Sequence, residues 1–293
     1  MSAYVDPRFR PTLWPGTAIP VPPLVRRIKD VRIKGDWLLW TPVPHDRELV
    51  HLPDDFYLRE LMELRADDLE GAAALYASYG SLFGADREDL HIDTPDLWEE
   101  LQKLPEADSD EQPYPFAVHR DVIRIYLETA QDAVATWIAC QREGGLEALV
   151  EPEITEEALT DSQSENLEVS ETPWPHSLEH LRELVIDDHI HALEQMLNRS
   201  LGRFSIGVGD LADRSPTVLS VAFLQLYNHL VEEAHVRRCA NDNCGRDFVR
   251  QRGRAEYGQH RTTGVKYCSR ECARAQAQRD LRRRRRTTAT TTP

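Results

Sequence analysis

The sequence predicts a mainly α-helical N-terminal body followed by a small treble-clef-like four-cysteine finger, made of a short β-hairpin and a helix. Two observations carry this fold class. Before residue 236, apolar residues recur at spacings of three and four along several long segments, as they do on the buried face of a helix. After it, four cysteines form a C-x4-C pair and a C-x3-C pair in a polar segment. With 293 residues the chain is long enough for one body and one appended module.

The N-terminal region divides into an arm and the first elements of the body. Residues 1–30 are expected to form a Pro-rich extended arm. Residues 31–43 have the composition of a short strand or hairpin around Gly35-Asp36, and a helical pattern runs from about Asp54 to residue 83. The chain starts with no charged-then-apolar leader, and no apolar run approaches the roughly 20 residues that cross a bilayer, so we expect a cytoplasmic protein.

The rest of the body, expected to extend over residues 31–236, alternates helices with acidic segments. Periodic apolar residues predict a helix over about 120–141, one or two helices over 176–202, and a last helix over 216–237. Acidic residues and proline are frequent in residues 105–115 and 151–175, which favours loops or flexible linkers there. The last helix leads into Cys239 without a Gly/Pro linker, which predicts that the finger is coupled to the body.

The cysteines predict one structural Zn²⁺ site with the ligands Cys239, Cys244, Cys268 and Cys272. Thiolates are soft ligands, and four of them in a closed shell are typical of structural zinc. Asn, Asp and Gly around the first pair favour a tight turn, and the spacing of the second pair places both thiols near one face of a helix that Ser269 can cap. Because a closed shell leaves no position for a catalytic water, we expect no enzyme activity.

The finger with its basic helix is expected to span residues 237–286, and the low-complexity residues 287–293 to form a disordered tail. Such a small unit has little apolar core, so metal binding must supply much of its folding free energy. A β-hairpin is expected between the two ligand pairs, where Gly253 and Gly264 can serve turns. The fifth cysteine, Cys140, lies on an apolar helical run and is expected to be an inert core thiol.

Charge is distributed unevenly along the chain. From Arg237 to the C-terminus there are 16 Arg and Lys against 5 Asp and Glu, whereas the preceding 236 residues hold 19 against 45. The net charges of +11 and −26 account for the −15 of the whole chain. An acidic body with a basic end predicts nucleic-acid binding by that end, with DNA favoured over RNA. The residues expected to contact nucleic acid are Arg250, Arg252, Arg254, Arg261, Lys266, Arg270, Arg274, Arg279, Arg282, Arg283, Arg284, Arg285 and Arg286.

The finger resembles that of the bacterial CGNR zinc-finger proteins. The likeness rests on Arg238-Cys239, Cys244-Gly245, the nearby Phe248, Tyr267-Cys268-Ser269 and the basic helix that follows. The family's Cys-Gly-Asn-Arg tetrapeptide stands here as Cys272-Ala273-Arg274-Ala275, and the second pair has one intervening residue fewer than is common in the family, so the chain resembles a divergent relative. The resemblance implies a helical, ABATE-type N-terminal region that senses a signal or mediates association, and a role as a DNA-binding transcription regulator.

Other interpretations stay open at this point. The basic finger could bind an acidic partner or RNA in a non-enzymatic assembly protein, or it could bind the chain's own acidic segment 151–171 and inhibit itself. His260 could replace a cysteine as a zinc ligand or serve as the base of a nuclease. Some treble-clef nucleases place a second histidine on the helix, and the helix after Cys272 contains none, so a solvated or phosphate-contacting His260 is favoured. The histidines between residues 176 and 191 could form a second metal site, but His189 and His191 do not share a helical face, which favours ordinary satisfied or solvated histidines.

Overall fold

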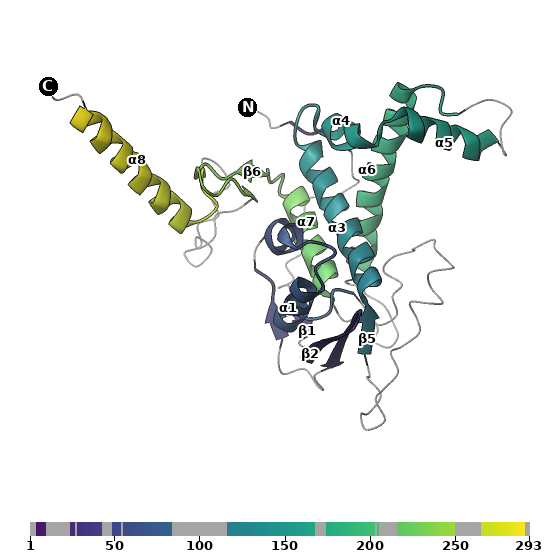
Figure 1. Cartoon of the computed structure of the whole chain (residues 1–293), viewed down its shortest axis with the longest axis horizontal. Coiled ribbons are helices and arrows are strands. Elements are labelled where there is room, and N and C mark those ends of the chain that lie inside the picture. Colours follow the sequence, from purple (N-terminus) through teal and green to yellow (C-terminus); the bar gives the residue numbers. More distant parts are fainter. Residues whose placement is uncertain are drawn as a thin grey trace.

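Three long helices form the centre of the body (Figure 1). These are α3 (Arg120–Cys140), α6 (Leu178–Gly202) and α7 (Val218–Val231), and α6 packs against both of the others. The computed structural model describes residues 4–9, 24–26, 28–42, 49–53, 55–83, 116–167, 174–202, 204, 216–249 and 265–290. Over these residues the protein is mainly helical, as predicted. Within the same ranges, no helix is both long and apolar enough to cross a membrane.

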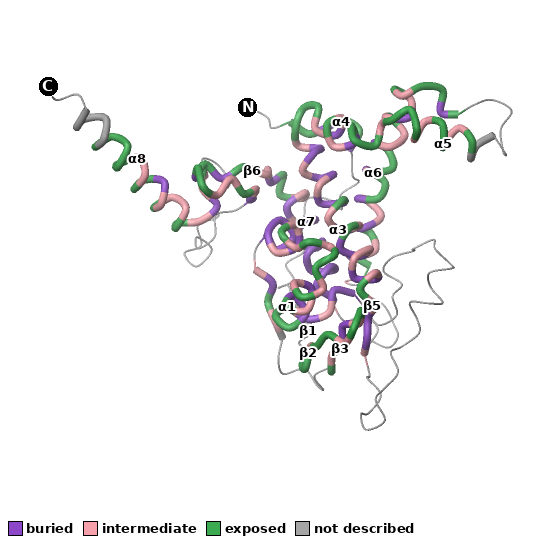
Figure 2. Tube along the Cα trace, viewed as in Figure 1, coloured by how far each residue is buried: buried purple, intermediate pink, exposed green. Residues whose placement is uncertain are grey.

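The helix predicted over 120–141 is confirmed as α3, and the one or two helices predicted over 176–202 are a single helix, α6. Helix α3 begins where the His119 side chain accepts a hydrogen bond from the backbone N–H of Asp121 (3.2 Å). Its apolar stripe, which includes Trp137, is buried in the centre of the body (Figure 2). Cys140 ends this stripe, and burial raises the pKa of its thiol to about 12, so Cys140 is the protonated core residue that the sequence indicated.

Helix α7 ends earlier than predicted, at Val231 instead of near Arg237. Glu233 adopts a left-handed conformation (φ 50°), the N–H of Ala234 bonds to the carbonyl of His229 (2.8 Å), and the N–H of Glu233 bonds to the carbonyl of Leu230 (3.1 Å). These two bonds form a Schellman motif, which stops a helix by satisfying its last carbonyls. Glycine is the usual residue at the left-handed position, so a glutamate there does not signal the end of a helix.

A small antiparallel sheet lies at one end of the helices (Figure 1). Its strand order is β2-β3-β5, with the bounds β2 (Ile28–Lys34), β3 (Trp37–Pro42) and β5 (Phe116–His119). The hairpin predicted over 31–43 is confirmed, and Gly35 supplies the positive φ (57°) that its turn requires. A separate two-stranded ribbon pairs β1 (Leu24–Arg26) with β4 (Leu49–His51).

The expected arm over residues 1–30 is only partly an arm, because β1 and the start of β2 belong to the strands of the body. The described residues 4–9 lie against the end of α3: the backbone N–H of Asp6 bonds to the carbonyl of Cys140 (2.7 Å). Arg8 bridges Asp6 (2.9 Å) and Glu147 (2.6 Å) of α4 (Gly145–Val150). This contact fixes the N-terminal residues to the helical body.

The single helix expected from Asp54 to residue 83 is divided into two. A short π-helix, η1 (Tyr57–Leu61), comes first, and α1 (Leu69–Tyr79) follows. The break occurs because the Asp68 side chain accepts a hydrogen bond from the N–H of Gly71 (2.9 Å) and so starts a new helix. Of the predicted apolar stripe, Phe56, Leu58 and Leu61 are buried in the core at η1, whereas Leu64 and Leu69 are partly buried and pack against it.

The acidic segment 151–175 was expected to be a flexible linker, but residues 151–167 are largely helical instead. A 3-10 turn, η2 (Glu151–Glu153), leads into α5 (Glu156–Leu167). The hydroxyl of Thr155 accepts a hydrogen bond from the N–H of Ala158 (3.1 Å), and acidic residues in the first turn are favoured by the helix dipole. The predicted loop at 105–115 lies outside the described residues.

Candidate metal centre

The first cysteine pair lies in the turn of a two-stranded ribbon that follows α7 in the chain. Strands β6 (Arg237–Arg238) and β7 (Asp247–Phe248) pair antiparallel, and the N–H of Cys239 bonds to the carbonyl of Arg246 (2.8 Å). Between the strands, the N–H of Cys244 bonds to the carbonyl of Asn241 (2.8 Å), and Gly245 supplies a positive φ (58°). We call the residues Arg237–Phe248 the knuckle. Its tight turn directs both sulfurs to one side, as the Asn-Asp-Gly composition predicted.

The second pair lies at the start of α8 (Arg270–Thr290). The backbone N–H of Cys268 donates a hydrogen bond to the Sγ of Cys239 (3.4 Å), and the N–H of Cys272 donates to the hydroxyl of Ser269 (3.2 Å). Ser269 therefore caps the helix as predicted. The helix continues to Thr290, so the first part of the expected disordered tail over 287–293 is helical, because nothing in the sequence stops a helix that has already formed. The last three residues of that tail lie outside the described residues.

The four sulfurs gather at one point. Their Sγ atoms all lie within 4.8 Å of one another; Cys244 and Cys268 are 3.7 Å apart, and Cys268 and Cys272 are 3.5 Å apart. A tetrahedron with metal–sulfur bonds of about 2.3 Å has sulfur–sulfur edges of about 3.8 Å. The geometry and the all-thiol donor set therefore fit a four-coordinate metal ion. Among the described residues, this is the one group of three or more His, Cys, Asp and Glu side chains that could hold a metal.

The thiols differ in their proton affinity because they share one small space. Burial raises the pKa of Cys268, and hydrogen bonds with Cys272 and Cys239 raise it further. Burial likewise raises the pKa of Cys244. For Cys272, burial acts in the same direction, but hydrogen bonds from Cys268, Ser269 and Asn241 outweigh it and lower the pKa to about 7. A metal ion must therefore displace protons from Cys244 and Cys268 to bind at neutral pH.

The finger is docked on the body through η1. The guanidinium of Arg59 is buried and donates a hydrogen bond from Nη2 to the carbonyl of Cys268 (3.3 Å). Val249, directly after β7, is buried in the main core of the body, whereas Phe248 belongs to the small core of the finger. Arg246 forms an ion pair with Glu63 (3.1 Å). The predicted coupling of the finger to the body is thus confirmed, although these contacts and not a continuous helix provide it.

Helix α8 projects away from the body (Figure 1). Its described arginine side chains, from Arg270 to Arg285, and the preceding Lys266 are exposed, except that Arg279 is half-buried. Arg279 and Arg283 lie on the side of the helix that faces the knuckle: Arg279 donates to the side-chain oxygen of Asn241, and Arg283 pairs with Asp242 (2.7 Å). The remaining predicted contact residues of the spacer, Arg250, Arg252, Arg254 and Arg261, lie outside the described residues, as do His260 and the expected hairpin. Arg286 is a residue of α8.

Sequence reasoning missed three residues that organise this site. Asn241 is buried, accepts from the N–H of Asn243 (3.1 Å) and donates to the carbonyl of Cys272 (3.3 Å). Gln276 is buried and bonds to the side chain of Asp242 (3.2 Å). Arg59 reaches the site from the other end of the chain. The position of Gln276 four residues after Cys272 was a usable signal for a knuckle-facing side chain, whereas no local pattern points to Arg59.

The histidines at 176–191 do not form a metal site among the residues that the structure describes. His189 lies between two elements, with Nε2 3.0 Å from the carboxylate of Glu153 and Nδ1 3.3 Å from the hydroxyl of Thr136. His176 and His180 lie next to each other at the start of α6, with ring centroids 5.2 Å apart. His189 is thus a satisfied histidine, as the sequence indicated.

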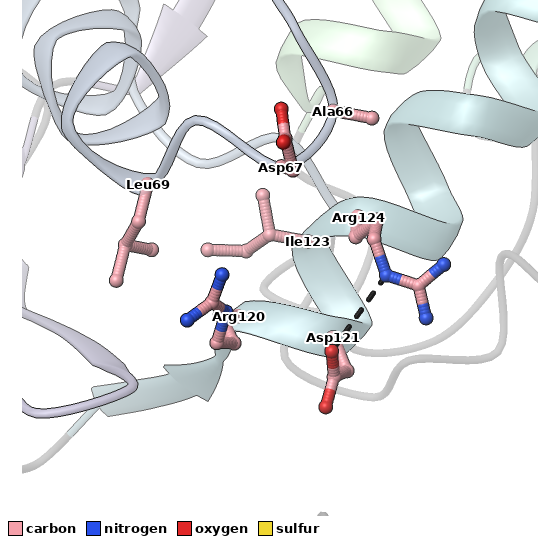
Figure 3. A pocket seen from close by; sticks show the side chains of 7 residues that line it. All are labelled: Ala66, Asp67, Leu69, Arg120, Asp121, Ile123 and Arg124. Carbon is pink, nitrogen blue, oxygen red and sulfur yellow. Dashed lines mark ion pairs between the residues drawn. The ribbon is translucent and has the colours of Figure 1, made fainter.

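A small pocket on the body lies between the turn before α1 and the start of α3 (Figure 3). Its volume is about 120 Å³, below the range of about 300–1,000 Å³ that small-molecule sites occupy. The charged side chains around it are paired: Arg124 with Asp121 (3.6 Å), Arg120 with Asp36 (3.0 Å), and Asp67 with Arg65 (2.8 Å). The pocket therefore offers room for a few water molecules and no free charge for a ligand.

Comparison with protein-family models, with curated proteins and with solved structures finds no match for this chain. The resemblance of the finger to the CGNR proteins therefore rests on the residues quoted above.

Proposed function

We propose that this protein is a zinc-dependent nucleic-acid-binding protein, and that it acts on DNA as a transcriptional regulator. The observation that carries the proposal is a four-cysteine cluster at the base of a basic helix that stands clear of an acidic body. The cluster determines where the helix starts, and the helix carries the largest concentration of positive charge in the chain. A phosphate backbone is the polyanion that such a surface fits best.

The metal in this proposal is one Zn²⁺ ion with a structural role. Cys239, Cys244, Cys268 and Cys272 would hold it, and the ion would link the knuckle to α8. The closed four-thiolate shell supports a treble-clef-like finger, since one ligand pair lies on a turn and the other at a helix start. Zinc then supplies folding free energy to a unit whose small core contains Phe248 and few other apolar side chains.

We further propose that the chain is a divergent relative of the CGNR zinc-finger proteins, with the helical body as the part that senses a signal or mediates association. The support is the sequence likeness of the finger and the direct contact between η1 and Cys268, through which a change in the body could reach the DNA-binding helix. π-Helical turns are frequent at functional sites, which is consistent with such a coupling at η1.

The test combines metal analysis with DNA binding by the full chain. We expect about one zinc ion per chain by elemental analysis, and binding to duplex DNA in fluorescence anisotropy that weakens as salt rises. Cys268→Ser should lose both the zinc and the binding, whereas Cys140→Ala, which changes a cysteine outside the cluster, should keep both.

Three outcomes would contradict the proposal. Full DNA binding by a zinc-free Cys268→Ser protein would remove the link between metal and function. Tighter binding to structured RNA than to duplex DNA would favour the RNA interpretation. Binding to polyglutamate without binding to either nucleic acid would favour an assembly protein with an acidic partner. Figure 1 places α5, in the acidic segment, and α8 at opposite sides of the body, so self-inhibition would need a different arrangement of these helices.

A further inference from the structure

Helix α8 has two opposite faces, each formed by four side chains at intervals of four, three and four residues. Cys272, Gln276, Arg279 and Arg283 follow one another at intervals of four, three and four residues, so they lie on one side of the helix. This is the side that contacts the knuckle. Gln276 accepts a hydrogen bond from the N–H of Asp242 (3.2 Å), and Arg279 and Arg283 bond to Asn241 and Asp242 as described above.

The second face begins two residues later, with the side chains Arg274, Gln278, Leu281 and Arg285 at the same intervals. A shift of two residues turns the position by about 200° around a helix, so this outer face points away from the knuckle. All four side chains are exposed, and Leu281 has 51 % of its surface accessible. Figures 1 and 2 show the helix standing apart from the body with exposed residues along it.

We propose that the outer face of α8 (Arg274, Gln278, Leu281 and Arg285) enters the major groove of B-form DNA and contacts base edges. This inference rests on the proposed function and adds to it which side of the helix binds and to what. The face extends over about 17 Å along the helix axis, and a B-form major groove, about 12 Å wide, admits an α-helix.

The chemistry of the outer face fits base edges better than it fits phosphates alone. Arginine makes bidentate contacts with guanine, glutamine does so with adenine, and an apolar side chain contacts the methyl group of thymine. A surface that bound only phosphates would gain nothing from Leu281 in the centre of the outer face. The positive charge of the outer face fits DNA. The same charge opposes pairing with the outer face of a second copy, because arginine would then meet arginine.

The inner face supports this use of the outer face. Gln276, Arg279 and Arg283 hold α8 on the knuckle at three successive positions, so the helix is ordered before it meets a partner. A preorganised helix loses less conformational entropy on binding. The inference therefore assigns different tasks to the arginines: Arg279 and Arg283 position the helix, Arg274 and Arg285 contact the groove, and Arg282 and Arg284 at its sides contact phosphates.

The test uses the full-length, zinc-loaded protein and a duplex selected from a random-sequence pool. Binding is measured with the major groove occupied by methyl green and, separately, with the minor groove occupied by distamycin. The inference predicts that methyl green displaces the protein and distamycin does not. The double variant Arg274→Gln/Arg285→Gln should lose on the order of tenfold more affinity than Arg282→Gln/Arg284→Gln, which removes the same charge from the sides of the helix.

Leu281→Ala gives a further readout, because it removes no charge. It should lower the affinity severalfold and leave the salt dependence unchanged. Zinc content and far-UV circular dichroism confirm that each variant is folded. DNA binding that resists methyl green, equal losses in the two double variants, or equal affinity for A-form duplex RNA, whose major groove is too deep and narrow for a helix, would overturn the inference while the proposed function stands. Absence of any nucleic-acid binding by the unaltered protein would overturn both.

Discussion

Arg59 gives the sharpest test of how the body supports the metal centre. Only 6 % of its surface is exposed, and Nη2 donates to the carbonyl of Cys268 at 3.3 Å. Among the described residues, its Nε has no hydrogen-bond partner. Zinc with four thiolates carries a net charge of −2, so a buried guanidinium beside one ligand lies where a positive charge is favourable. We therefore expect Arg59→Met to weaken zinc binding.

The size of the effect follows from the hydrogen bond. A bond that involves a charged group contributes about 1.5–3 kcal/mol, and a length of 3.3 Å places this one near the lower value. About 1.5 kcal/mol corresponds to a roughly tenfold weaker Kd for zinc. The zinc-free protein should lose little stability. Its finger lacks the metal that supplies much of its folding free energy, so the hydrogen bond contributes mainly to the zinc-bound state, and Arg59→Met also removes a buried charge whose desolvation is costly.

The assay is competition for zinc with a chelator of known affinity, and chemical denaturation of the zinc-free protein measures stability. Arg142→Met is the matched control, because Arg142 also connects the body to the finger, through Asp247 (3.4 Å), but is mostly exposed. An exposed ion pair contributes about 0–1 kcal/mol, so the control should change the zinc Kd by a fewfold at most. Equal shifts in the two variants, or a Kd for Arg59→Met within twofold of the original, would refute the reasoning.

Three further predictions concern protons, a buried hydrogen bond and a helix end. Because the pKa of Cys272 is about 7, this thiol is mostly protonated at pH 6 and mostly ionised at pH 8. Zinc binding should therefore release about one proton fewer per ion at pH 8 than at pH 6, and zinc affinity should rise with pH. Calorimetry in buffers of different ionisation enthalpy measures the number of protons released. Tyr57→Phe removes the hydroxyl 2.6 Å from Nδ1 of buried His229 and should lower the free energy of unfolding by about 1–3 kcal/mol, whereas Tyr4→Phe, at an exposed residue, should change it little. Glu233→Gly should raise the free energy of unfolding by roughly 0.5–1 kcal/mol in urea denaturation, because glycine adopts the left-handed conformation without strain; a decrease would contradict this account.

The parts of the structure that the sequence predicted correctly depend on local patterns. The apolar spacing of α3 and α6 repeats over many turns, and the four cysteines lie in two short motifs, so neither prediction needed knowledge of distant residues. The hairpin at Gly35 followed from one residue that accepts a positive φ.

The errors have equally specific causes. The stop of α7 uses a glutamate, Glu233, where glycine is usual, and α5 is a helix with the acidic composition of a linker. The division of α8 into two faces follows from residue spacing, but which face meets the knuckle depends on contacts with Asn241 and Asp242 that the spacing does not reveal. The contact of Arg59 joins residues 209 positions apart, which no local pattern reveals.

The contact between Arg59 and Cys268 also has a consequence for how the finger folds while the chain is being synthesised. Synthesis proceeds from the N-terminus, so η1 and the helices of the body leave the ribosome well before the second cysteine pair. A body that folds during synthesis would already present Arg59 and the apolar surface for Val249 when the knuckle appears. The last ligands would then meet their metal against a folded template, so the maturation of the finger would depend on the correct folding of the chain that precedes it.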